Sequence, residues 1–127
     1  MNSRGNLKHI LIVDDSADLQ VLLMQLFKSV GYKISQAFDG SQALDMLQKS
    51  GDSPSVVLLD IMMPVMDGIE LKSAMNKDLK FADIPVIWMS ADAGSLRKAR
   101  ALGGVDFIQK PITDLDGLIT KVENTQT

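Results

Sequence analysis

The run Val56–Asp60 (VVLLD) constrains this chain more than any other stretch. Four apolar residues lead into an acid, and Pro64 and Asp67-Gly68 then interrupt the chain. A short apolar run between turn signals predicts a strand that is buried on both faces. A carboxylate at the end of such a strand is costly unless it is paired or simply makes a turn. The role of Asp60 therefore depends on which side chains the rest of the sequence brings to it.

Further apolar runs alternate with segments of helical spacing. The predicted strands are Ile10–Val13, an edge strand within Tyr32–Phe38, Val56–Asp60, Pro85–Met89 and Val105–Gln109. The predicted helices run from Ser16 to Val30, around Ala43–Leu47, from Gly68 to Met75, from about Asp92 to Leu102, and from Thr113 or Asp114 to Val122. This alternation predicts an α/β fold, a single doubly wound five-stranded parallel sheet with five helices on its two faces.

Composition narrows the class of protein. A chain of 127 residues is expected to form one domain, 1–127, with Met1–Leu7 and Asn124–Thr127 as loose ends. A net charge of −3 argues against a nucleic-acid surface, and the absence of cysteine excludes disulfides and thiolate catalysis. No signal peptide and no apolar run of about 20 residues is present, so a cytoplasmic location is expected.

Two single residues have simple structural interpretations. His9, the only histidine, stands at the start of its strand and is expected to be solvated. Trp88 is a large residue inside a buried strand and is expected to pack in the core. Asp15 or Ser16 could cap the helix that follows the first strand, but one cap needs only one side chain, so Asp14 requires another explanation.

Five polar residues stand where predicted strands end. They are Asp14 and Asp15 after the first strand, Asp60 after the third, Ser90 after the fourth and Lys110 after the fifth. Parallel strands place all of them at one edge of the sheet, where ligands bind in such folds. Two carboxylates at ~4 Å repel by roughly 4 kcal/mol at an effective dielectric of about 20, so a cation must offset them.

The cation could be Lys110 or a divalent metal ion. Ligands that are all oxygen favour Mg²⁺ over a transition metal. A hydroxyl, an ammonium and a metal ion around a carboxylate form a site for a phosphoryl group, with Asp60 as nucleophile.

The chain resembles the receiver domains of response regulators, the CheY-like superfamily, over about residues 8–123. The resemblance rests on short motifs in a fixed order: Ile12-Val13-Asp14-Asp15, Leu59-Asp60, Met63-Pro64, Asp67-Gly68, Ser90-Ala91 and Phe107-Ile108-Gln109-Lys110-Pro111. It implies the flavodoxin-like strand order 2-1-3-4-5 and a cis bond before Pro111.

The resemblance also implies roles. Asp60 accepts a phosphoryl group from a phosphohistidine, and Asp15, Asp60 and the backbone carbonyl of Met62 bind Mg²⁺, with Asp14 acting through a water. Lys110 pairs with a phosphoryl oxygen, Ser90 turns inward to bond another, and Phe107 turns with it as the switch residue. The domain is then a switch in a two-component phosphorelay rather than a turnover enzyme.

Departures from the family pattern matter. Serine replaces the commoner threonine at position 90, and Gly103-Gly104 stands where Gly-Ala is usual, which predicts a looser start to the last strand. Phe107 could be plain core filler, and Asp92 could either orient an attacking water or hinder access.

Three other functions fit the sequence less well. A phosphatase of the haloacid-dehalogenase type needs an acid two residues after the nucleophile, where this chain has Met62. A flavodoxin-like cofactor binder needs a phosphate loop after the first strand, where this chain has acids. A receiver that no longer takes phosphate is disfavoured, because all five strand-end positions carry competent groups.

The expected partners are a sensor histidine kinase or a histidine phosphotransfer protein, together with a downstream target. The surface of the fourth helix, fifth strand and fifth helix would be read by that target and could form a homodimer. The sequence identifies neither the kinase nor the target, nor whether the domain acts alone or within a longer protein.

Overall fold

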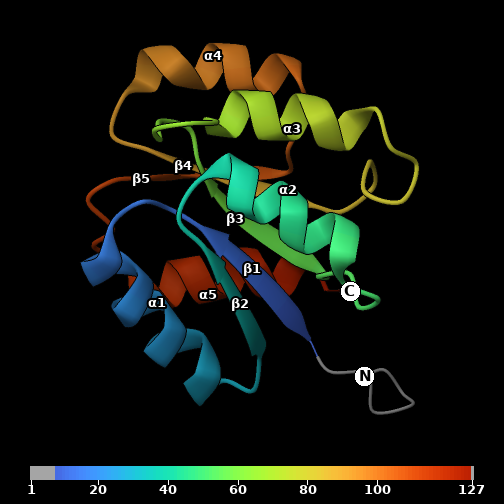
Figure 1. Ribbon diagram of the computed structural model, residues 1–127. Coiled ribbons are helices and arrows are strands. Elements are labelled where there is room, and N and C mark those ends of the chain that lie inside the picture. The colour runs from blue at the N-terminus through green and yellow to red at the C-terminus, as the bar shows by residue number, and fades with distance from the viewer. Residues whose placement is uncertain (1–7, 127) are drawn as a thin grey trace.

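The computed structural model describes residues 8–126 as one parallel sheet between two layers of helices (Figure 1). The strands are β1 (His9–Val13), β2 (Lys33–Ala37), β3 (Val56–Asp60), β4 (Val86–Ser90) and β5 (Asp106–Gln109), in the order β2-β1-β3-β4-β5. The helices are α1 (Ala17–Ser29), α2 (Gly40–Lys49), α3 (Gly68–Asn76), α4 (Ala93–Ala101) and α5 (Leu115–Asn124). The predicted fold and strand order are confirmed.

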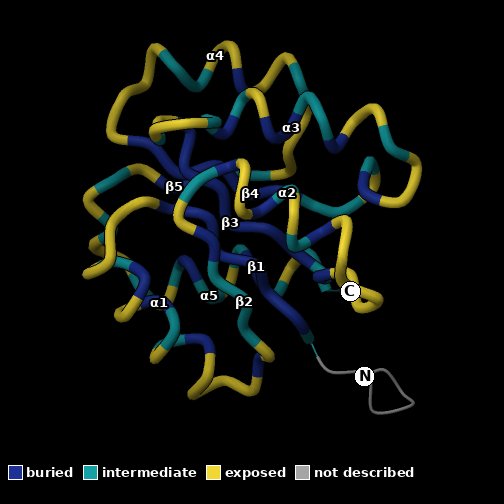
Figure 2. Tube along the Cα trace, in the orientation of Figure 1, coloured by how far each residue is buried: buried dark blue, intermediate teal, exposed yellow. Residues whose placement is uncertain are grey.

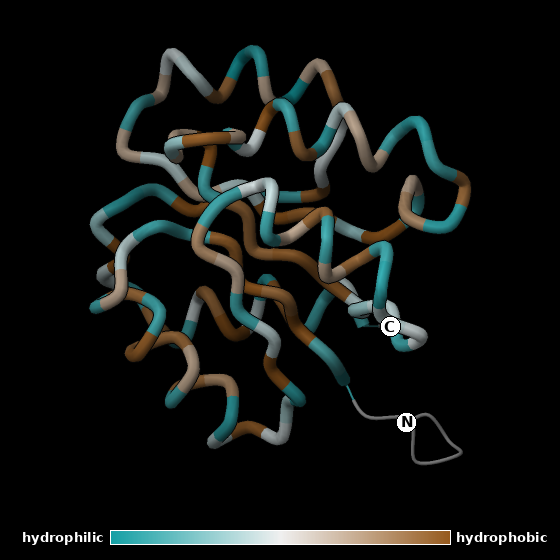
Figure 3. Tube along the Cα trace, in the orientation of Figure 1, coloured by the Kyte–Doolittle hydropathy of each residue, from teal (hydrophilic) through white to brown (hydrophobic). Residues whose placement is uncertain are grey.

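The sheet separates two hydrophobic cores. On one face, Leu59 and Trp88 pack among buried residues of α2, α3 and α4, and on the other, Leu58 and Ile87 pack with α1 and α5. Successive strand residues point to opposite faces, so strands covered on both sides must be apolar throughout. The central strands are accordingly buried in Figure 2 and coloured as hydrophobic in Figure 3.

Side chains cap the start of every helix among the described residues. Ser16 caps α1 and Asp114 caps α5, each one of two candidates that the sequence offers, and Asp67 caps α3 within a capping box. Asp39 caps α2, which therefore begins at Gly40, ahead of the predicted apolar segment. No helix within residues 8–126 has the length and apolar character needed to cross a membrane.

His9 is buried, and the expectation of a solvated side chain is wrong. Its Nε2 lies 2.8 Å from the Ser35 hydroxyl, and its Nδ1 lies 3.7 Å from a carboxylate oxygen of Asp52. Burial lowers the pKa of His9, and the negative charge of Asp52 offsets part of that effect. His9 is therefore held as a packed residue of the sheet's amino end.

The prediction of a loose carboxyl end is also wrong in part. Helix α5 extends through Asn124, and the Gln126 amide oxygen accepts a hydrogen bond from the Ser55 hydroxyl at 2.7 Å. Glu123 pairs with Lys8 at 3.0 Å and accepts a hydrogen bond from Tyr32. Long-range polar contacts of this kind leave no periodic signal in the sequence. Met1–Leu7 and Thr127 lie outside the described residues.

The turn between α4 and β5 contains Gly103 and Gly104, both with positive φ, at 116° and 100°. A Cβ atom on Gly104 would lie 2.3 Å from Nε1 of Trp88. The second glycine is therefore required because the indole occupies the space that an alanine methyl group would need. Trp88 is 1% exposed, so the prediction of a core residue is confirmed.

Candidate functional site

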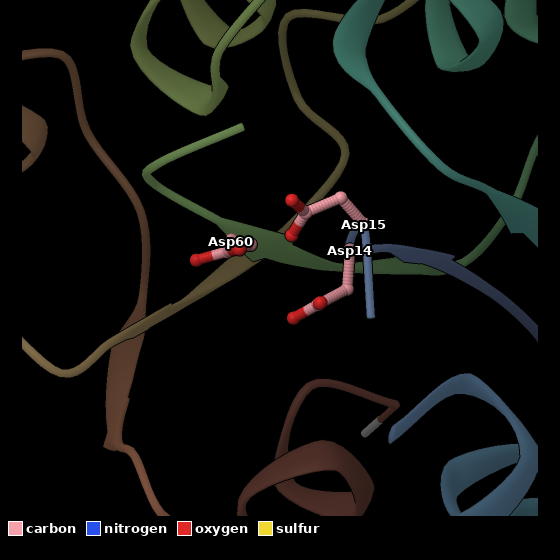
Figure 4. A group of neighbouring side chains, drawn as sticks. All are labelled: Asp14, Asp15 and Asp60. Carbon is pink, nitrogen blue, oxygen red and sulfur yellow. The ribbon is translucent and has the colours of Figure 1, made fainter. Parts of the chain in front are cut away.

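Three carboxylates meet at the carboxyl edge of the sheet, between β1 and β3 (Figure 4). Asp14 and Asp15 follow β1, and Asp60 is the last residue of β3. One carboxylate oxygen from each lies within 4.8 Å of the other two. Asp14 and Asp60 are buried, whereas Asp15 is exposed. The structure thus brings together the three acids that the sequence predicts at one edge.

The loop after β1 is held by Gln20, a buried residue of α1 that the sequence interpretation missed. Its side-chain amide donates to the backbone carbonyls of Ile12, Asp14 and Ala37 at 3.1, 3.1 and 2.8 Å. Gln20 shares the helix face of Leu23 and Phe27, the other buried residues of α1. A polar residue in line with that buried face is the signal that could have identified it.

The chain after β3 packs tightly behind Asp60. A Cβ atom on Gly68 would lie 2.2 Å from the Asp60 carbonyl oxygen, and the Gly68 N–H donates to the carbonyl of Ile61 at 2.9 Å. Only glycine allows the start of α3 to approach the strand this closely. The Asp67-Gly68 pair therefore supplies both the helix cap and the space that keeps Asp60 in place.

Lys110 supplies positive charge to the site. Its Nζ lies 2.6 Å from Asp14 and 3.2 Å from Asp60, and the side chain is 21% exposed. Burial alone would lower the pKa of Lys110, but its hydrogen bonds and charge pairing with the two aspartates outweigh burial and raise it. Lys110 is therefore protonated and joins the ends of β1 and β3 to the end of β5.

One ammonium does not balance the acids. Burial, followed by the charge of Asp14, raises the pKa of Asp60 to about 6, although Lys110 and the Met62 backbone N–H oppose the rise. The unbalanced negative charge and the set of carboxylate oxygens suit a hard divalent cation such as Mg²⁺. These residues fit the predicted ion.

Ser90 lies at the end of β4 and is buried, but its hydroxyl faces the following turn. The hydroxyl oxygen accepts a hydrogen bond from the Asp92 N–H at 2.9 Å, and the hydroxyl donates one to the Asp92 carbonyl at 3.2 Å. Asp92 itself caps α4, because its carboxylate accepts from the Gly94 N–H at 2.9 Å and from the Ser95 hydroxyl at 2.9 Å. Ser90 and α4 are thus linked through two backbone groups.

The remaining predicted residues flank this edge. Phe107 lies on β5 opposite Trp88 of β4, half-buried, and packs against the core that contains Trp88. The Met62 side chain is exposed, and its sulfur accepts a hydrogen bond from the Ser95 hydroxyl at 3.8 Å. The Lys110–Pro111 peptide bond is cis, as the resemblance implies.

Comparison with known proteins agrees with this arrangement. The family described as response regulator receiver domain matches residues 10–123. The chain is 40% identical over 109 residues to sporulation initiation phosphotransferase F of Bacillus subtilis, covering 84% of each chain. Several relatives named as transcriptional regulators are longer, and the chain spans 40 to 44% of their length.

Solved structures share the fold. The signal receiver domain of a histidine kinase from Syntrophus aciditrophicus superposes with a TM-score of 0.83 at 28% identity, covering 93% of this chain and 89% of that one. The receiver domain of the sensor histidine kinase PA1611 from Pseudomonas aeruginosa, solved with a magnesium ion in its active-site cleft, gives 0.85 at 22% identity, covering 96% and 100%. The chain therefore belongs to the response regulator receiver domain family, the signalling domains of two-component systems.

Proposed function

We propose that Asp60 is the phosphoacceptor of this receiver domain and that the donor is a phosphohistidine on a kinase or phosphotransfer protein. A carboxylate oxygen of Asp60 attacks phosphorus, and an O–P bond forms as the N–P bond to the donor imidazole breaks. The imidazole nitrogen keeps the electron pair and takes up a proton. The observation that carries this proposal is the convergence of Asp14, Asp15, Asp60 and Lys110 at one edge of the sheet.

The other residues of the site serve the same step. Asp15, Asp60 and the backbone carbonyl of Met62 would hold a Mg²⁺ ion, with Asp14 acting through a water, and the positive charge there would offset the phosphoryl oxygens. Lys110 releases part of its pairing with Asp14 and Asp60 and binds a phosphoryl oxygen.

Phosphorylation then changes a surface rather than starting turnover. The Ser90 hydroxyl exchanges its bonds with Asp92 for a phosphoryl oxygen, and the half-buried Phe107 turns further inward. The surface of α4, β5 and α5 responds as a two-state element and binds a downstream target or a second copy of the chain. Met62, an exposed thioether, offers no general acid for a phosphatase of the haloacid-dehalogenase type.

A surface beside the site suits the phosphohistidine carrier. Val21 and Leu22 of α1 are 51% and 41% exposed, although the helix has a complete buried face of its own. Leu22 also lines a groove of about 490 Å³, together with Lys110, Pro111 and Ile112. A helical partner that covers these apolar residues would place its histidine near Asp60.

Phosphorylation by a small-molecule donor tests the proposal. The purified chain is incubated with Mg²⁺ and phosphoramidate, and a mass increase of one phosphoryl group is expected for the wild type and absent from Asp60→Asn. Asp52→Asn is the matched control, because that carboxylate lies at the opposite end of the sheet beside His9. Equal labelling of Asp60→Asn and the wild type would show that another residue is the acceptor.

A further inference from the structure

Trp88 occupies a position that no expected role of the site uses. It precedes Ser90 by two residues on β4, so the two side chains point to the same face of the sheet. On the neighbouring strand its register partner is Phe107, which packs against the same core cluster. The indole thus lies on the same face of the sheet as Ser90 and beside Phe107, the two predicted switch residues.

The other side of the indole meets the turn between α4 and β5. Its Nε1 donates a hydrogen bond to the carbonyl of Gly103 at 2.9 Å. The absent Cβ of Gly104 leaves space for the ring, since such an atom would lie 2.3 Å from Nε1 and 2.8 Å from Cδ1. Both glycines have positive φ, so the turn is shaped around the indole.

Helix α4 packs on the core through Leu96 and Ala99, and side-chain hydrogen bonds link it to neighbouring elements at its two ends. Its first turn is linked to Ser90 through Asp92, and its last turn is linked through the Leu102 carbonyl to the Asn76 amide at 2.9 Å. Ala99 is the buried residue between these ends. Trp88 contacts the chain just after the carboxyl-terminal end of this helix, through its hydrogen bond to the Gly103 carbonyl.

We propose that Trp88 is a positioning residue that transmits the state of Ser90 and Phe107 to the carboxyl-terminal end of α4, through its hydrogen bond to Gly103 and its packing on Gly104. A close-packed interior leaves the ring no room to stay fixed when the side chain beside it turns inward. The indole shifts, and the Gly103 carbonyl moves with it. The inference rests on the proposed function, because phosphorylation at Asp60 is what would turn Ser90 and Phe107.

Backbone NMR with a phosphoryl mimic tests this coupling. The wild type and Trp88→Phe are titrated with Mg²⁺ and beryllofluoride, and the amide signals of residues 60–62 and 101–105 are followed. In the wild type both groups are expected to shift. In Trp88→Phe, which keeps an aromatic ring but lacks the N–H, residues 60–62 should still shift and residues 101–105 should lose most of their shift. Phe27→Leu, in the core on the opposite face of the sheet, is the matched control and should keep both responses.

The outcomes separate the two proposals. A full shift of residues 101–105 in Trp88→Phe overturns the role of Trp88 and leaves the proposed function intact. If the amide signals of residues 60–62 do not shift in the wild type, the proposed function is overturned and this inference with it. If Trp88→Phe does not fold, the wild-type indole N–H signal decides the matter. It should move over the same mimic concentrations as the Gly103 amide, and an indole signal that stays fixed while that amide moves overturns the inference.

Discussion

Replacing Gly104 by alanine should destabilise the domain strongly, because two separate penalties fall on one methyl group. The residue has a φ of 100°, a region that side chains rarely adopt. The new Cβ would also lie 2.3 Å from Nε1 of Trp88, far inside van der Waals contact. The structure allows the two penalties to be measured separately.

The magnitude follows from adding these terms. Backbone strain at a positive φ costs about 1–3 kcal/mol, and overpacking in a core costs about 1–3 kcal/mol more. The free energy of unfolding should fall by roughly 2–6 kcal/mol, and the urea midpoint by roughly 1–3 M at an ordinary m-value of about 2 kcal/mol/M. Urea unfolding followed by far-UV circular dichroism measures both, without depending on the fluorescence of Trp88.

Two other glycines are matched controls. Gly31 has a φ of 92° but open space around its Cβ position, so Gly31→Ala carries the strain without the collision. Gly51 has open space and no positive φ, so Gly51→Ala should change the free energy of unfolding by less than about 0.5 kcal/mol. The expected order of destabilisation is Gly104→Ala, then Gly31→Ala, then Gly51→Ala.

A double-mutant cycle isolates the contact with the indole. In a Trp88→Leu background the collision is removed, so Gly104→Ala should cost no more than Gly31→Ala, with a coupling energy of about 1–3 kcal/mol. If Gly104→Ala is no more destabilising than Gly31→Ala in the wild-type background, or if the cycle shows no coupling, the indole does not fill the space beside Gly104 and the reasoning fails.

Three further predictions concern buried polar groups. Asp60→Asn should raise the free energy of unfolding by about 1–3 kcal/mol without Mg²⁺, because it removes a buried charge facing Asp14. Added Mg²⁺ should reduce the difference in free energy of unfolding between variant and wild type in urea titrations, and a destabilised variant would contradict the prediction. His9→Asn should gain in thermal midpoint relative to the wild type as the pH falls below about 6.5. Burial lowers the folded pKa of His9, so the unfolded chain binds the proton first and acid destabilises the wild type. Thermal midpoints of the two proteins that stay parallel from about pH 8 to about pH 5 would show that His9 is not held neutral, or that Asp52 compensates. Gln20→Ala should cost about 2–4 kcal/mol in urea unfolding, since backbone carbonyls lose their partner; a loss below about 0.5 kcal/mol would mean that water replaces the amide.

The fold and the acidic edge could be predicted from the sequence because each rests on a local pattern. Apolar runs ending in polar residues gave the strands, and the parallel sheet then placed Asp14, Asp15, Asp60 and Lys110 together. Both steps use only periodicity and topology. A capping residue such as Ser16 could also be predicted, because a cap involves residues within one turn of helix.

What could not be predicted depends on contacts between distant segments. His9 is buried because Ser35 and Asp52 approach it from other elements, and Gln20 is buried because three carbonyls converge on it. The second glycine of the α4–β5 turn predicts a looser start to β5, but Trp88, 16 positions earlier in the chain, fills the space beside it. Such pairings are a property of the packed structure and leave no period in the chain.

The two cores on opposite faces of the sheet have a consequence for how such a domain can evolve. The exposed apolar residues of α1 belong to one face, while Trp88 and Phe107 belong to the other, with strands of backbone between them. Substitutions separated in this way act nearly additively. A lineage could therefore exchange the proposed partner of α1 while keeping the proposed coupling through Trp88 intact, and could alter that coupling without losing the partner.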